Sequence, residues 1–289
     1  MIAAHNEAPV IGRCLDALFA DARPGEFDVT VVANGCVDRT AEAAAAHGAR
    51  VVEIGAASKP RALNAGDDVA VGFPRVYLDA DIVVDADVVR ALRDALDGAG
   101  RPMAAVPRRR VDLTGCPLPV RHYVAISSQL PVYRDGLFGR GMIALSADGR
   151  ARFGRFPDMV ADDLFLDAQF GAAEKIQVER VHTVVAAPRS TRALVRRLVR
   201  VRRGNSAMRA ASRAGIVSAR VRDADRFAWL RDVVVPDPRL VGAAVSYVVI
   251  STLAAVLARR EPDSSTAWGR DDSTRTGPHT QSGGGGSHA

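Results

Sequence analysis

Cysteine is scarce in this sequence of 289 residues. Cys14, Cys36 and Cys116 are the three present, and no two of them have the close spacing of a zinc-binding pair. The odd number and the wide separation predict neither a disulfide framework nor a structural zinc site, and they fit a reducing compartment. The opening MIAAHNEAP also lacks the basic segment and apolar run of a secretory signal. We therefore expect a cytoplasmic protein.

Lysine is scarcer still, because it occurs only at positions 59 and 175 among 39 basic residues. This preference for arginine is typical of a GC-rich genome, and we predict no nucleic-acid partner from it. The net charge of +6 is unevenly distributed, since twelve arginines between Arg189 and Arg226 are opposed only by Asp223 and Asp225. A segment of this kind predicts an anionic neighbour.

What the first 107 residues do contain is a regular alternation of β-rich and helical runs. The pattern indicates five strands and four helices, and it predicts an α/β fold with a mostly parallel central sheet flanked by helices. After residue 119 the sequence continues with a helix, a glycine-rich segment (136–146), an acidic cluster (160–167), a strand (176–186) and an arginine-rich stretch that should be helical. The expected strands of the first part are 2–4, 27–33, 50–54, 75–79 and 102–107.

Residues 240–258 form an uncharged run between Arg239 and Arg259. A helix of this length spans roughly 28 Å, close to the thickness of the bilayer hydrocarbon core. Its five alanines, its glycine and its serines make it only moderately apolar, so a single spanning helix and an interfacial or core helix both remain open. Arginines before this run outnumber those after it, so a span would leave the preceding domain in the cytoplasm. Either way we expect an anionic membrane surface as a partner.

Polar residues follow three of the predicted strands. His5-Asn6-Glu7 follows the first strand, Asn34 to Asp38 the second, and Asp79-Ala80-Asp81 the fourth. The carboxyl ends of parallel strands meet at one edge, where such sheets bind ligands. Two carboxylates there suit Mg²⁺ or Mn²⁺, which fills its remaining positions with phosphate oxygens and water. The pattern predicts a site for a metal and a diphosphate, with a solvated acidic turn as the alternative.

Seven motifs extend this interpretation. IAAHNE, VVANGCVDRT, KPRALNAG, YLDADIVVD, GRGMIALS, VADDLFL and RRLVRVRRGN occur in the order and approximate spacing seen in the family-2 glycosyltransferases, so residues 1–205 resemble that family. The resemblance implies the GT-A fold and an inverting transfer of sugar from a nucleotide-diphosphate sugar, UDP- or GDP-linked, to an acceptor hydroxyl. A lipid-linked or cell-envelope acceptor is a further expectation, and Mg²⁺ or Mn²⁺ is the implied cofactor.

The resemblance also assigns roles to residues. Asp79 and Asp81 would serve ribose and metal, Asp163 would be the catalytic base, and Asp162 and Gly141 would lie on the acceptor side. Asn34 would face the base, although the family usually has aspartate there and an amide leaves the identity of the base open. The set implied to bind the donor is Ala3, Glu7, Asn34, Lys59, Asp79, Ala80, Asp81, Arg202 and Arg203.

Asp162 and Asp163 open an apolar helical run. We expect Asp162 to cap this helix and Asp163 to lie in its first turn, where the helix dipole favours the ionised carboxylate that a base requires. Two acids that merely cap a helix are the alternative.

The motifs also predict how the chain is divided. We expect a catalytic domain over 1–188, with a nucleotide-sugar half (about 1–107) and an acceptor half (about 108–188). An arginine-rich helical segment (189–238), an apolar helix (239–260) and a disordered tail (261–289) would follow.

Two other functions remain open. One is a nucleotidyltransferase of related architecture, although that class expects a glycine-rich basic loop after the first strand, and AAHNEAPV has no glycine. The other is a non-catalytic basic adaptor that binds a membrane or nucleic acid through residues 189–226.

Overall fold

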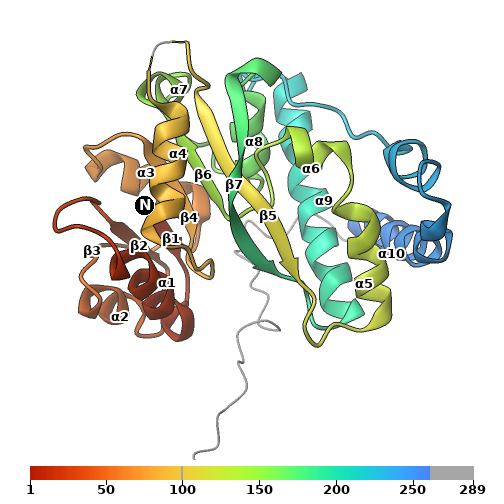
Figure 1. Cartoon of the computed structure of the whole chain (residues 1–289), viewed down its shortest axis with the longest axis horizontal. Helices are drawn as coiled ribbons and strands as arrows, with labels where there is room; N and C mark the ends of the chain where they lie inside the picture. The colour runs from red at the N-terminus through yellow and green to blue at the C-terminus, as the bar shows by residue number, and fades with distance from the viewer. Residues whose placement is uncertain (99, 261–289) are drawn as a thin grey trace, which may run out of the picture.

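The central feature of the computed structural model, which describes residues 1–98 and 100–260, is a seven-stranded sheet flanked by helices (Figure 1). The strand order is β3-β2-β1-β4-β6-β5-β7, and β6 is antiparallel to both of its neighbours while all other pairs are parallel. The predicted mostly parallel sheet is therefore confirmed. The tail expected to be disordered, 261–289, lies outside the described residues.

The element boundaries follow the sequence pattern closely in the first half of the chain. The strands are β1 (Ile2–Ala4), β2 (Thr30–Asn34), β3 (Arg50–Ile54), β4 (Arg75–Asp79), β5 (Ala104–Asp112), β6 (Met142–Leu145) and β7 (Lys175–Ala186). The helices are α1 (Ala8–Ala20), α2 (Thr40–Ala46), α3 (Lys59–Val69), α4 (Ala86–Leu96), α5 (Leu118–Ser127), α6 (Pro131–Asp135), α7 (Ala147–Ala151), α8 (Asp162–Ala168), α9 (Thr191–Arg213) and α10 (Val241–Arg260). Three short turns of other helix types are η1 (Ala172–Glu174), η2 (Trp229–Val234) and η3 (Pro238–Leu240).

The sheet separates two hydrophobic cores, because successive side chains of a strand point to opposite faces. In β1, Ile2 packs with α1, α2 and α4, whereas Ala3 packs on the other face with α3, α8 and α9. In β6, Ala144 and Ile143 divide in the same way. Both faces of the sheet are thus covered, and the edge formed by the carboxyl ends of the strands is left to bind ligands.

Serine or aspartate side chains fix the first turns of α3, α4, α7 and α9. Ser58 accepts a hydrogen bond from the Arg61 amide at the start of α3, and Asp85 accepts one from the Val88 amide at the start of α4. Ser190 does the same for α9. Each such cap stabilises a helix by about 1 kcal/mol and fixes where it begins. The cap of α3 matters most for the site, because Lys59 is the next residue.

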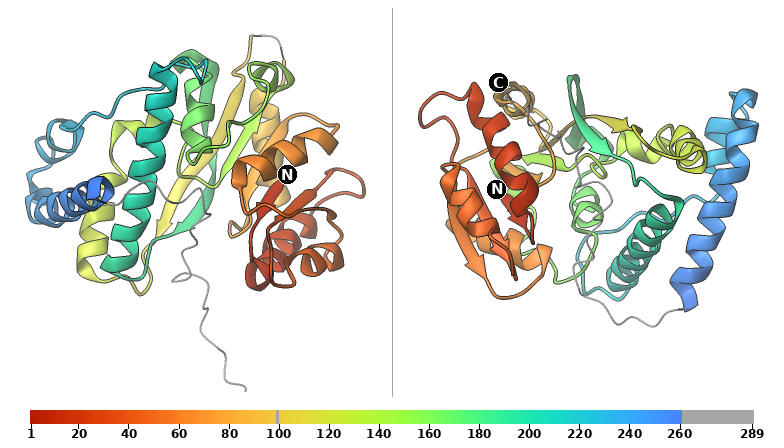
Figure 2. Two further views of the ribbon diagram at one scale, coloured as in Figure 1. Left: turned by 180° about the vertical axis from the view of Figure 1, so that it is seen from behind. Right: turned by 90° about the horizontal axis from the view of Figure 1, so that it is seen from below.

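The second half of the chain forms a helical layer at the side of the molecule away from β1, β2 and β3. Here α10 lies against α5 and α9 (Figures 1 and 2). Ile250 and Ala254 of α10 are buried in one cluster with Val120 of α5 and Leu194 of α9. The arginine-rich segment is helical over 191–213, as predicted, and irregular from there to η2.

Candidate active site

A cavity of about 790 Å³ opens at the carboxyl ends of β1 and β4 and extends between α5, α8 and α9. Residues that lie far apart in the sequence line it together. Of the residues predicted for the site, its lining includes Ala3, Glu7, Lys59, Asp79, Ala80, Asp81, Gly141, Asp162 and Asp163.

The acids after β4 lie on the floor of this cavity. Asp79 ends the strand and is paired with Ala3 of β1, and the chain then turns, because the Ile82 amide donates to the Asp79 carbonyl at 3.1 Å. Ala80 and Ile82 are buried while Asp81 is exposed. The turn therefore fixes Asp81 at the cavity wall, just beyond the end of the strand.

Gly141 lets the neighbouring chain approach this turn closely. Its carbonyl accepts a hydrogen bond from the Asp79 amide at 2.8 Å, and its φ is +68°, which a residue with a side chain rarely adopts. A Cβ at this position would lie 2.4 Å from Ile82 Cγ1 and 3.3 Å from Asp79 Oδ2. A side chain here would displace the acids.

Lys59 connects Asp79, at the end of β4, with Asp162 of α8. Its Nζ lies 2.8 Å from Asp79 Oδ1 and 2.8 Å from Asp162 Oδ2. Burial opposes the charge of the ammonium group, but the attraction of Asp162 and Asp79 outweighs it and raises the pKa of Lys59 well above its usual value. The lysine therefore stays charged and binds both groups of acids to each other.

Asp163 lies beside this pair in a different environment. Burial and the neighbouring charge of Asp162 raise its pKa to about 7, whereas the Lys59 ammonium and a hydrogen bond from the Gly139 amide (3.2 Å) act in the opposite direction. We expected the helix dipole to favour the ionised carboxylate, but the effect of burial on the pKa of Asp163 is larger. A carboxylate with a pKa near neutrality is well matched to proton transfer at neutral pH.

The expected role of Asp162 as a helix cap is wrong. The N-cap position of α8 is Ala161, and no side chain caps the helix there. Ala161 has φ +100°, a rare conformation for a residue with a side chain and one that tends to persist at functional sites. Asp162 lies within the first turn, where it pairs with Lys59.

Two carboxylates suffice for a cation whose other ligands come from its substrate. Within residues 1–98 and 100–260, no group of three or more His, Cys, Asp or Glu side chains is arranged to hold a metal ion. Mg²⁺ and Mn²⁺ often use only one or two carboxylates and fill the rest of the shell with phosphate oxygens and water. Asp79 and Asp81 fit a cation that arrives together with a diphosphate.

The comparisons with known proteins agree with this arrangement. Residues 1–140 match the model of the family described as Glycosyl transferase family 2. The match covers 140 of the 289 residues, a little under half of the chain, and includes Asp79 and Asp81. The resemblance noted in the sequence and the interpretation as a glycosyltransferase are thereby confirmed. No curated protein matches the sequence.

Two solved structures are similar to this chain. A mannosyltransferase from Pyrobaculum calidifontis in complex with GDP-Man and Mn²⁺ is 19% identical, with a TM-score of 0.57, and the match covers 90% of this chain and 74% of that one. Glucosyl-3-phosphoglycerate synthase from Mycobacterium tuberculosis, in complex with Mn²⁺, UDP and phosphoglyceric acid, is 22% identical with a TM-score of 0.47 over 63% of this chain and 68% of that one. The first of these likenesses confirms the predicted GT-A fold.

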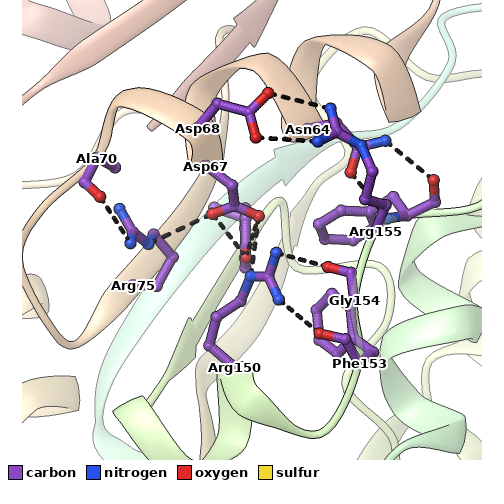
Figure 3. A network of polar contacts seen from close by, with 11 residues as sticks. Asn64, Asp67, Asp68, Ala70, Arg75, Arg150, Phe153, Gly154 and Arg155 are labelled. Carbon is purple, nitrogen blue, oxygen red and sulfur yellow. Dashed lines mark hydrogen bonds and ion pairs between the residues drawn. The ribbon is translucent and has the colours of Figure 1, made fainter.

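A network of polar contacts holds the loop before Asp162 and Asp163 against α3 (Figure 3). Asp67 of α3 pairs with Arg150 at 3.0 Å and with Arg75 at 3.3 Å. Asp68 binds Arg155 through two contacts of 3.0 Å, and Asn64 exchanges two hydrogen bonds with the backbone of Phe156. The helix that begins with Lys59 therefore also fixes the loop that leads to Asp162.

Asp158, near the end of the same loop, also binds the start of α3. Asp158 accepts hydrogen bonds from the Ser58 hydroxyl (3.0 Å) and from Arg61 Nε (2.8 Å). Ser58 and Arg61 flank Lys59, so both contacts lie beside the site. The spacing of charges along the sequence gave no signal for these long-range pairs.

Two of the predicted donor-binding residues lie elsewhere. Arg202 and Arg203 do not line the cavity; they line a separate hollow between α9 and α10. On α9 the cavity is instead reached by Arg197, Arg200 and Arg209. The helical period explains this for Arg203, which lies about 160° around α9 from the cavity-lining residues 201 and 205.

Asn34 is also not part of the cavity lining. Its side chain is fully buried between the first two loops, and its Nδ2 donates to the Ala4 carbonyl at 2.7 Å. Within the described part of the chain its Oδ1 has no hydrogen-bond partner. The contact with the nucleotide base that the resemblance implied stays a prediction.

Sequence reasoning missed two buried charges that support the acid pair. Arg140, between Gly139 and Gly141, is 1% exposed and donates to the carbonyls of Tyr133, Gly136 and Phe138. Asp167 of α8 is 2% exposed and binds Lys175 at 2.5 Å and Arg222 at 3.1 Å. Both stabilise the backbone around Asp163 from beneath the cavity, and no local motif marks either of them.

Proposed function

We propose that the protein is an inverting glycosyltransferase that uses a nucleotide-diphosphate sugar together with Mn²⁺ or Mg²⁺. The observation that carries the proposal is the meeting of two acid pairs in one cavity, Asp79 with Asp81 and Asp162 with Asp163, joined by Lys59. Solved structures of similar fold contain Mn²⁺ with GDP-Man or, in other relatives, Mn²⁺ or Mg²⁺ with UDP.

The donor would bind at the carboxyl ends of β1 and β4. Asp81 and Asp79 would hold a cation that neutralises charge on the diphosphate and so stabilises the departing nucleotide. Lys59 would remain near the phosphates as a second positive charge. Ala3 and Glu7 line the same part of the cavity and would contact the nucleoside.

Asp163 would act as the base on the acceptor side. As the acceptor oxygen forms its bond to the anomeric carbon, the bond from that carbon to the diphosphate breaks, and the hydroxyl proton passes to the Asp163 carboxylate. A single displacement of this kind inverts the anomeric centre. Asp162 stays paired with Lys59.

The acceptor would bind beyond Asp163, where the cavity becomes apolar. Its lining there includes the apolar side chains Val111, Val124, Val185, Leu194 and Leu198, with Arg109 and Arg197 among them. We propose an acceptor that joins a hydroxyl to an anionic group and an apolar part, as a lipid-linked acceptor does. Peripheral association with an anionic membrane belongs to the same proposal.

Nucleotide-sugar hydrolysis in the absence of acceptor tests the proposed function. We expect one or a few sugars from a panel of UDP- and GDP-linked sugars to release UDP or GDP slowly and only with Mn²⁺ or Mg²⁺. A nucleotidyltransferase would instead release pyrophosphate from a nucleoside triphosphate. Release of pyrophosphate, or no metal-dependent turnover of any nucleotide sugar, would contradict the proposal.

A further inference from the structure

The outer face of α10 is apolar although it is exposed. Val241, Val245, Val248, Val249, Leu253 and Val256 are 37–64% exposed, and no charged residue interrupts the helix between Arg239 and Arg259. Their spacing of three, four, seven and eight residues places them in one stripe, about 22 Å long at 1.5 Å per residue. We call these six residues the outer stripe. A helix on a water-exposed surface normally carries its charges on such a face.

The opposite face of α10 is fixed to the folded domain along its whole length. Ala243 and Ala244 are buried near its start and Ile250 and Ala254 in its second half. Ser246 lies 3.2 Å from His122 Nδ1 of α5. The helix Pro238–Arg260 is long and apolar enough to cross a membrane by length and composition alone. It could not do so without drawing α5 and α9 into the bilayer, so the packing favours a helix that lies along a surface.

A basic hollow adjoins the outer stripe at the end of α10. Its volume is about 390 Å³, and it is lined by Arg202, Arg203 and Arg259 around a floor of small residues, Ser206, Ala207, Ala210, Ala255 and Ala258. Arg203 also holds the end of α10, through contacts of 3.4 Å to the carbonyls of Leu257 and Ala258. Guanidinium groups around a small, open hollow match a phosphate group in charge and in geometry.

We propose that α10 lies in the interface of an anionic bilayer, with the outer stripe among the acyl chains and the basic hollow on a phospholipid headgroup. The combination of an apolar face with arginines at its edge fits an anionic membrane better than a second protein, whose surface would have to supply both features. Membrane binding by α10 does not itself depend on the proposed function. The inference rests on that function only for the reason why the protein would bind a membrane. Helices α5 and α9, which support α10, also line the acceptor side of the cavity, so docking would bring that cavity close to lipid.

Co-sedimentation of the full chain with vesicles tests the proposal. Vesicles of phosphatidylcholine alone are compared with vesicles that contain about a quarter phosphatidylglycerol, at low salt and at ~0.5 M salt. We expect binding to the anionic vesicles that weakens with salt, and release of the bound protein by alkaline carbonate, as for a protein that does not span. Retention after carbonate would contradict a helix that lies on the surface.

Two double variants test the outer stripe and the basic hollow separately. Val245→Glu with Val249→Glu places charges in the outer stripe and should lower binding at least tenfold, whereas Val71→Glu, an exposed valine on a distant loop, should leave it unchanged. Arg202→Ala with Arg259→Ala should lower the preference for anionic vesicles at least fivefold, and Arg13→Ala on α1 should not. Circular dichroism confirms that each variant is folded.

Three further results would overturn the proposal. The first is a wild-type chain that does not bind anionic vesicles at low salt, and the second is a stripe variant that binds as well as the wild type. The third is a wild-type dimer that the stripe variant converts to a monomer, because a second copy would then cover the outer stripe. Nucleotide-sugar hydrolysis in the same preparations keeps the two proposals apart, because a wild-type chain that hydrolyses the nucleotide sugar but does not bind anionic vesicles contradicts only the membrane proposal.

Discussion

Asp162 and Asp163 are neighbours in sequence, but their surroundings give them different chemistry. Asp162 is held by Lys59 at 2.8 Å, whereas Asp163 is turned toward the Gly139 amide and has its pKa raised to about 7. The Lys59 ammonium occupies Asp162 Oδ2, whereas a carboxylate with a pKa near neutrality is well matched to proton transfer at neutral pH. The roles of the two residues can therefore be separated by substitution.

Asp163→Asn should reduce turnover by about 10² to 10⁴, because the amide keeps the shape of the side chain but cannot accept the acceptor proton. Donor binding should survive, since nucleotide and metal are held around Asp79 and Asp81. The measurement is single-turnover transfer together with calorimetric binding of the nucleotide. Asp162→Asn is the matched control and should retain more activity, with Lys59 still paired to Asp79. An active Asp163→Asn beside an inactive Asp162→Asn would mean that the other member of the pair is the base.

The pH dependence of the reaction follows from the raised pKa of Asp163. The base must be ionised, so kcat/KM should fall about tenfold for each pH unit below this pKa and level off above it. A cation bound nearby attracts the carboxylate and moves the inflection to pH 7 or below. A rate that increased as the pH was lowered from 7 to about 5 would show that a protonated group is required instead.

The same shift affects stability in the opposite sense. Asp163 binds its proton more tightly in the folded chain than in the unfolded chain, so the folded state loses stability as the pH rises from about 4 through 7. Asp163→Asn removes this term and should unfold at a temperature no lower than the wild type at pH 8. A clearly lower melting temperature would contradict the burial of an ionised carboxylate at this position.

At the scale of the element, α9 packs closely against the loop that precedes Asp162 and Asp163, and a single glycine of α9 allows this contact. Gly204 is buried where α9 crosses the chain at Val160, and a Cβ at Gly204 would lie 2.9 Å from Val160 Cγ1 and 3.0 Å from the Val160 carbonyl oxygen. Val160 directly precedes Ala161 and the acid pair. The position of Asp163 therefore depends on how closely α9 can approach.

Gly204→Ala should lower both the melting temperature and the turnover. At a solvent-exposed helix position, replacing glycine with alanine stabilises the fold by up to about 1 kcal/mol. Overpacking against backbone, as expected at Gly204, costs about 1–3 kcal/mol. Gly242→Ala on α10 is the matched control, since nothing lies within 4 Å of its added Cβ. We expect thermal unfolding to show a lower midpoint for Gly204→Ala and an equal or higher one for Gly242→Ala. Equal midpoints for both variants would contradict the close contact.

The sequence predicted the elements of the first half well, because there the local signals agree with the fold. The strands 50–54 and 75–79 have the predicted boundaries, since apolar β-rich runs are followed directly by polar turns. The long extension of β5 to Asp112 was missed, because it begins with three consecutive arginines after Pro107 and pairs with β7 beyond a shift in register at that proline. Pairing over a long sequence distance leaves no local pattern.

The candidate site was predicted in part for the same reason. Loops after strands can be placed at one sheet edge by topology alone, so Glu7, Asp79 and Asp81 line one cavity as expected, whereas Lys59 was included only through the family resemblance. Side-chain direction on a long basic helix cannot be inferred from a motif that has arginine on every face, so Arg202 and Arg203 were predicted for the cavity although they line a separate hollow. The partners Asp158 and Asp167 depend on how the two halves pack, which local signals do not encode.

At the scale of the whole molecule, the cavity lies where the two halves of the chain meet. Residues before 107 supply Asp79 and Asp81, and residues after 107 supply Asp163, the proposed base, and the apolar part of the lining. α10 covers the far side of the helices that line this second half. We infer a division of labour in which the first half binds the donor and the second half binds the acceptor.

Calorimetric binding of UDP and GDP, with and without Mn²⁺, to the wild type and to Asp81→Asn tests the central claim of a metal-dependent nucleotide site most directly. We predict that one of the two nucleotides binds in the presence of Mn²⁺. We further predict that Asp81→Asn weakens this binding at least about tenfold, or about 1.4 kcal/mol, because a full charge is lost from a site for a hard cation. Nucleotide binding that neither requires Mn²⁺ nor changes in Asp81→Asn would contradict the account.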